Sequence, residues 1–157
     1  MMLFLAILLV VCFIFVDTDW LYRISLVEQM AYYHFLHANV FHLAANMLAG
    51  YYAFKRCTVS RVVTAYLIAS LSFLCVADMV IGFSNIVYAM IGLKTPAFSH
   101  PWWRHPGTIT FLVVSLLMVF LPNVSAVTHI ISFCGGMAVS MISRGVQQIK
   151  NDSARYI

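Results

Sequence analysis

The segment HANVFHLAANM, residues 37–47, places two histidines and two asparagines among mostly apolar residues. His42 and Asn46 are four residues apart, so a helix presents both on one face. Burying such polar groups in an apolar medium is costly unless hydrogen bonds satisfy them. The role of these polar residues therefore depends on whether the segment lies in water or in a membrane. The composition of the whole chain answers that question.

The composition is that of a membrane protein. The chain has 157 residues, 63% of them hydrophobic and 9% charged, and its mean hydropathy is +0.93; soluble domains contain roughly 25% charged residues. No repeat or linker divides the chain, so we expect one all-α, polytopic domain over residues 1–157. Short breaks, most of them charged or proline-containing, separate six predicted transmembrane helices: Met1–Val16, Val40–Phe54, Val62–Ile81, Ser84–Leu93, Thr108–Leu121 and Ser125–Ile142.

The basic residues give the orientation, because lysine and arginine are enriched on the cytoplasmic side of membranes. With both termini in the cytoplasm, eight of the nine basic residues lie inside and Arg23 alone lies outside. The net charge of +4 thus reports topology. No basic patch interleaved with aromatic residues indicates a nucleic-acid partner.

Three further features concern the first helix, the loop that follows it and the cysteines. Met1–Val16 lacks the basic start and the small-residue cleavage site of a signal peptide, so we interpret it as the first helix. The loop 17–39 is too apolar for a free loop and is predicted to lie in the outer interface as short amphipathic pieces. The four cysteines show no C-x-x-C spacing and are interpreted as packing residues.

Counting residues upward from the cytoplasmic charges brings four polar side chains to one depth. Asn46 precedes Lys55 by nine residues, which is roughly 14 Å of helix, and His42 lies roughly 20 Å up. Ser84 precedes Lys94 by ten residues, or roughly 15 Å. His129 precedes Arg144 by fifteen residues, or at most about 23 Å. A helix beginning at Ser84 is too short to start at the outer surface of a bilayer about 30 Å thick.

A buried layer of one serine, two histidines and one asparagine indicates nucleophilic catalysis. A serine hydroxyl becomes a good nucleophile when a positioned base removes its proton, and His129 is the natural base for Ser84. Attack on an amide creates an oxyanion, which requires hydrogen-bond donors already directed at it. His42, Asn46 and the backbone N–H of Ser84 are the predicted donors.

These motifs resemble those of the rhomboid intramembrane serine proteases in their compact, six-helix bacterial form. The matching segments are HANVFHLAANM, GFSNIVYAMIG at residues 82–92 and HIISFCGG at residues 129–136, and the resemblance covers nearly the whole chain. It implies a rhomboid-like bundle in a bacterial inner membrane that uses no cofactor or metal. The substrates would be transmembrane proteins, cleaved in or near a membrane segment after a small residue, with lateral entry near the fifth helix.

The resemblance also assigns roles to individual residues. It implies a Ser84–His129 dyad without a third acid and an oxyanion site of His42, Asn46 and the Ser84 amide. It implies that Tyr88 packs on the His129 ring and that His37 is structural or solvent-associated. Gly82 occupies the first position of the family's G-x-S-G motif. Within the last helix, Ser132 and Gly136 form a small-x-x-x-small pair, which would let the fourth and sixth helices approach closely.

One departure keeps other functions open. Asn85 stands where the motif has its second glycine, and asparagine tolerates unusual backbone conformations better than most residues. A catalytically inactive rhomboid-like protein that binds client transmembrane helices is therefore one alternative. Another is a metal- or haem-binding protein, although no H-E-x-x-H motif is present. The candidate ligands for that alternative are His34, His37, His42 and His129.

Individual residues also have structural alternatives. Ser84 could be a serine bonded to its own helix, Asn46 could join helices, and His129 and Tyr88 could be ordinary core residues. Asp78 precedes the loop into the fourth predicted helix and is expected to cap the third, outside the catalytic set.

Overall fold

A computed structural model describes residues 2–75, 81–95, 102–104, 106, 108–109, 113 and 125–155. Among these residues every regular element is helical. The fifth predicted helix, Thr108–Leu121, falls almost entirely outside the described residues, as does Asp78. The longer helices are α1 (Met2–Phe15), α3 (Val40–Phe54), α4 (Val59–Ser72), α5 (Ser84–Lys94) and α7 (Ala126–Ser153).

Short helices form the loop between α1 and α3. They are the 3-10 turn η1 (Thr18–Arg23), α2 (Leu26–Tyr32) and the 3-10 turn η2 (Tyr33–Phe35); the further 3-10 turns are η3 (Phe73–Cys75), which continues α4, and η4 (Trp102–Arg104). Ser25 and Glu28 form a capping box at the start of α2, a local signal that the sequence carries at N-cap spacing. The loop is therefore built from short helical pieces, as its apolar composition predicts.

Polar residues fix where the helices begin. The Asn39 side chain accepts a hydrogen bond from the His42 N–H at 2.9 Å and so caps α3. Thr58 caps α4 and Ser125 caps α7 in the same way. Each cap satisfies one of the backbone N–H groups that a helix start leaves free. The caps on α3 and α7 place His42 and His129 in or next to the first turns of their helices.

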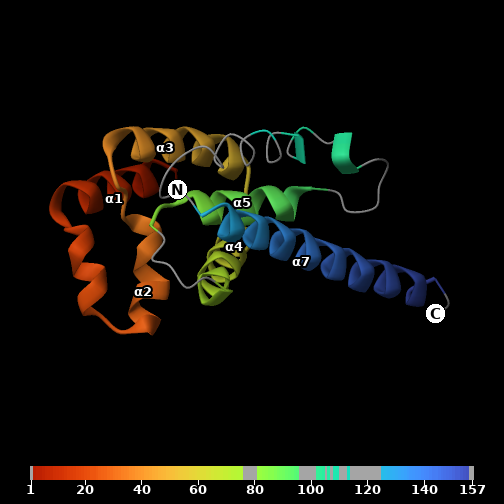
Figure 1. Ribbon diagram of the computed structural model, residues 1–157. Helices are drawn as coiled ribbons and strands as arrows, with labels where there is room; N and C mark the ends of the chain where they lie inside the picture. The colour runs from red at the N-terminus through yellow and green to blue at the C-terminus, as the bar shows by residue number, and fades with distance from the viewer. Residues whose placement is uncertain are drawn as a thin grey trace.

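Helix α5 lies at the centre of the bundle and packs against α7, α4 and α3 (Figure 1). Two glycines allow the close contact with α7. A Cβ atom at Gly92 would overlap the Phe133 carbonyl oxygen, and one at Gly136 would overlap the Ala89 carbonyl oxygen. The backbones of α5 and α7 therefore touch directly, as small residues permit in membrane helices.

The pairing of small residues differs from the one predicted. Gly136 does lie at the α5–α7 contact. The Ser132 hydroxyl, however, donates to the Ser72 hydroxyl at 2.9 Å, at the end of α4. Gly92, which no sequence pattern marks, completes the contact.

Helix α7 is longer than its apolar run. The prediction ends the helix at Ile142, whereas α7 continues to Ser153. The residues after Ile142 include no proline, and glutamine, lysine and arginine are good helix formers, so only the hydrophobicity stops there. Of the helices in the described part of the chain, α7 is the one long and apolar enough to cross a membrane; Leu3–Phe15 and Val59–Cys75 are shorter apolar helices.

Candidate active site

Ser84 and His129 meet at the centre of the bundle. Ser84 is the first residue of α5, and His129 lies in the first turn of α7. The Ser84 Oγ is 2.7 Å from the His129 Nε2. The side chains are 6% and 2% exposed. This is the geometry that a general base needs to take a proton from a nucleophile, with the His129 proton on Nδ1.

Tyr88 packs against the His129 ring. It follows Ser84 by one helical turn, so both side chains lie on the same face of α5. The Tyr88 and His129 ring centroids are 4.4 Å apart, with an angle of 34° between the ring planes. The structure thus brings Tyr88 onto the His129 ring, where it restricts the rotation of the imidazole.

His42 and Asn46 face the turn that precedes Ser84. Gly82 has a φ of +123°, which residues with side chains rarely adopt. A Cβ atom at Gly82 would lie 2.7 Å from the His42 Cε1 and 3.4 Å from the Asn46 Nδ2. Glycine is therefore required twice here, by the backbone conformation and by the approach of the two side chains.

Within the described part of the chain, the Asn46 amide is a buried donor without an acceptor. Asn46 is 4% exposed, and among the described residues its Nδ2 has no hydrogen-bond partner. Leaving such a group unpaired costs about 1–3 kcal/mol. A donor left unpaired next to Gly82 can bond an acceptor that a bound molecule supplies.

His37 also belongs to this cluster. Its Nε2 accepts a hydrogen bond from the Phe83 N–H at 3.5 Å, and its ring meets the His42 ring edge-on at 5.2 Å. Burial, with a smaller contribution from the neighbouring His42, lowers the pKa of His37 to about 4. His37 is therefore neutral at physiological pH and acts as a hydrogen-bond acceptor for the backbone next to Ser84.

Two residues at this site have no signal in the sequence. The Asn85 Nδ2 donates to the Tyr33 hydroxyl at 3.2 Å, and the Tyr33 carbonyl accepts from the Gly82 N–H at 2.9 Å. Tyr33 sits in a loop rich in aromatic residues, and no spacing rule connects it to α5. The sequence shows Asn85 only as a departure from a motif, without its partner.

The described histidines are not grouped as a metal site would require. In the described ranges, no group of three His, Cys, Asp or Glu side chains is placed to hold a metal ion. The His34 Nε2 is instead 3.1 Å from the Ser70 Oγ, in a buried pair, and the His34 ring lies 3.8 Å from that of Tyr33. Burial lowers the pKa of His34 to about 3.

Comparison with known families identifies the fold. The family model of the Rhomboid domain matches residues 21–145, which include every site residue described above. The chain belongs to the rhomboid family. A search of curated proteins finds no match to it.

Rhomboids are integral membrane proteins, usually serine proteases that act on transmembrane substrates within the bilayer. In this rhomboid the matched region runs from η1 to the middle of α7. It thus contains the loop of short helices, the central helix α5 and the α5–α7 contact that brings Ser84 to His129.

Proposed function

We propose that this rhomboid is an active intramembrane serine endopeptidase and that Ser84 and His129 form its catalytic dyad. The observation that carries the proposal is the 2.7 Å contact between the Ser84 Oγ and the His129 Nε2. A serine that merely filled space in a membrane helix would bond to its own backbone. Residues 1–157 would form a single transmembrane domain with six spans and both termini in the cytoplasm of a bacterial cell.

The chemistry follows from the positions of the two groups. The Ser84 Oγ attacks the carbonyl carbon of the scissile peptide bond while its proton moves to the His129 Nε2. The tetrahedral intermediate collapses as the C–N bond breaks, and His129 returns the proton to the leaving amine. A water molecule then attacks the acyl-enzyme, with His129 again acting as base, and releases Ser84.

The negative charge of the intermediate develops at the N-terminus of α5. The Ser84 N–H, the Asn46 Nδ2 and a His42 ring N–H are the proposed donors to this oxygen. The helix start adds a favourable field, because the peptide dipoles of α5 place partial positive charge there. Asn46 contributes most clearly, since its Nδ2 is unpaired within the described part of the chain.

A cleavage assay tests the proposal. The wild type, Ser84→Ala and the matched control Ser140→Ala are compared on a transmembrane reporter in liposomes. Ser140 is also a buried serine, but it lies farther along α7. We expect cleavage by wild type and by Ser140→Ala, and none by Ser84→Ala. Equal cleavage by wild type and Ser84→Ala would remove Ser84 from the mechanism.

Asn85 favours a second candidate, an inactive rhomboid that binds client transmembrane helices. A fluorophosphonate probe distinguishes the two functions without requiring a suitable substrate. Covalent labelling of wild type that Ser84→Ala abolishes supports the protease. An unlabelled wild type that is folded, by its thermal transition, supports the inactive protein.

A further inference from the structure

Tyr33 makes hydrogen bonds with residues on both sides of Ser84 in the chain. We call residues 82–85, which surround Ser84, the nucleophile turn. Ahead of Ser84, the Gly82 N–H donates to the Tyr33 carbonyl oxygen at 2.9 Å. Behind it, the Asn85 Nδ2 donates to the Tyr33 hydroxyl at 3.2 Å. The backbone and the side chain of a single residue in η2 thus bracket the turn.

Tyr33 is itself firmly held. Its hydroxyl donates to the Ala69 carbonyl oxygen at 2.7 Å, and its ring lies 4.9 Å from that of Phe73. Ser72 donates to the same Ala69 carbonyl at 2.6 Å and accepts a hydrogen bond from Ser132. The network therefore joins the nucleophile turn to the end of α4 and to α7, which carries His129.

The chemistry of the tyrosine suits this place. Tyr33 and Asn85 are both 0% exposed, and burial raises the pKa of Tyr33 to about 12. The hydroxyl therefore keeps its proton, so it can donate to Ala69 while accepting from Asn85. A glycine at position 85, as in the G-x-S-G motif, could not make this bond.

We propose that Tyr33 and Asn85 act as a clamp that sets the directions of the Ser84 hydroxyl and amide, and that both are positioning residues of this rhomboid. The clamp rests on the proposed protease function. Catalysis is sensitive to such positioning, because a misplacement of about 1 Å at a reacting group can lower the rate about 100-fold. Asn85 would then be part of the working site in this chain.

Tyr33→Phe is the direct test. It removes the acceptor of the Asn85 Nδ2, and the Asn85 Oδ1 already has no partner among the described residues. Both polar atoms of a buried amide would be unpaired, so the turn should shift to solvate them. We expect kcat to fall about 10- to 100-fold with KM within about twofold, and fluorophosphonate labelling of Ser84 to slow by a similar factor.

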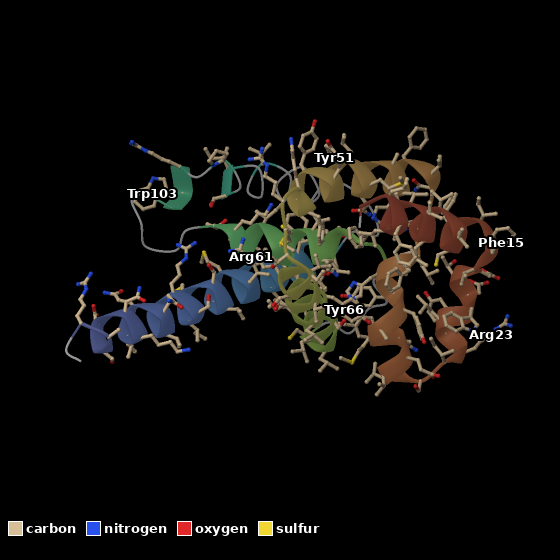
Figure 2. All side chains as sticks on the ribbon, turned by 180° about the vertical axis from the view of Figure 1, so that it is seen from behind. Phe15, Arg23, Tyr51, Arg61, Tyr66 and Trp103 are labelled. Carbon is tan, nitrogen blue, oxygen red and sulfur yellow. The ribbon has the colours of Figure 1, made fainter. Side chains whose placement is uncertain are left out.

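Tyr66→Phe is the matched control. The Tyr66 hydroxyl donates to the Ala31 carbonyl oxygen at 3.0 Å, which joins α4 to α2 without involving the nucleophile turn (Figure 2). Both variants lose one tyrosine-to-backbone hydrogen bond, and Tyr33→Phe also loses the bond from Asn85, so we expect both thermal midpoints to fall and that of Tyr33→Phe to fall further. Only Tyr33→Phe should lower kcat. Equal effects of the two variants on kcat, or none from either, would overturn the clamp.

A double-mutant cycle separates the clamp from a general structural role. Asn85→Ala removes the other end of the bond and should lower kcat by a factor similar to that of Tyr33→Phe. Because the two residues act through one bond, the double variant of Tyr33→Phe and Asn85→Ala should have a kcat no lower than that of the less active single variant. Losses that multiply would refute the coupling.

Amide hydrogen exchange at the nucleophile turn tests the clamp independently of proteolytic activity. Exchange should be faster in Tyr33→Phe than in Tyr66→Phe, whether or not the wild type is a protease. An unlabelled wild type whose turn responds in this way would contradict the proposed protease function and leave the clamp as a structural device. An active wild type whose turn does not respond would contradict the clamp alone.

Discussion

Replacing Asn46 with leucine should separate activity from stability. Leucine has nearly the shape of asparagine but no polar atoms. In the described part of the chain, the Asn46 Nδ2 is a buried donor without a partner, which costs the folded state about 1–3 kcal/mol. If substrate supplies the missing acceptor, the donor is retained for catalysis. Its removal should then harm the reaction while relieving the fold.

The expected magnitudes follow from these two roles. Loss of one oxyanion donor typically lowers kcat about 10²- to 10³-fold, and we expect a decrease in that range for Asn46→Leu. The thermal midpoint should be unchanged or higher by a few degrees, because about 1 kcal/mol corresponds to roughly 2–4 °C in a chain of this size. Reporter cleavage measures the first quantity, and thermal unfolding in detergent measures the second.

Thr58→Ala calibrates the experiment. Thr58 caps α4 at the opposite end from the site, and loss of such a cap typically costs about 1 kcal/mol. This variant should unfold at a lower temperature with unchanged kcat. If Asn46→Leu lowers the thermal midpoint as Thr58→Ala does and leaves kcat within about threefold, Asn46 is a structural residue and the oxyanion assignment is wrong.

Three further outcomes are expected. Gly82→Ala should lower kcat at least about 100-fold, since its Cβ would lie 2.7 Å from the His42 Cε1 and displace a side chain from the site; unchanged cleavage kinetics would contradict this. Gly92→Val should abolish the folded state in a thermal scan, because its side chain would overlap the α7 backbone, whereas Gly145→Val, with open space around it, should unfold like wild type. Burial lowers the pKa of His34 from 6.5 to about 3, so below about pH 6.5 the unfolded chain binds more protons than the folded chain and stability decreases as the pH decreases. His34→Gln should therefore flatten the dependence of the thermal midpoint on pH between pH 7 and 5. An unaltered slope would refute this.

Much of the site geometry follows from simple counting along the helices. The sequence predicts similar depths for Asn46 and Ser84 because they precede Lys55 and Lys94 by nine and ten residues. The structure shows the physical basis: the Lys94 Nζ donates to the Lys55 carbonyl oxygen at 3.1 Å, so the ends of α3 and α5 are level. Because each helical residue adds the same rise, Asn46 and Ser84 then lie in the same layer. The i, i+4 spacing of His42 and Asn46 likewise requires a shared face.

The parts that counting misses are those set by contacts between distant segments. Gly92 shows no special pattern in sequence, and its importance appears only when α7 packs on it. The helix α7 extends past Ile142 because backbone hydrogen bonding does not depend on hydrophobicity, which is the property that defines a span. Neither feature could be obtained from local periodicity.

Tyr33 is the clearest case of a residue that only the fold can identify. Its hydrogen-bond partners Ala69 and Asn85 are 36 and 52 residues away in the chain, and its loop lacks a helical or alternating pattern that would orient it. Asn85, considered alone, weakens the resemblance to an active protease. Considered with Tyr33, the same asparagine fills a buried position with a hydrogen bond that glycine could not form. The fold therefore gives the Asn85 side chain a buried partner at the position where the motif has glycine.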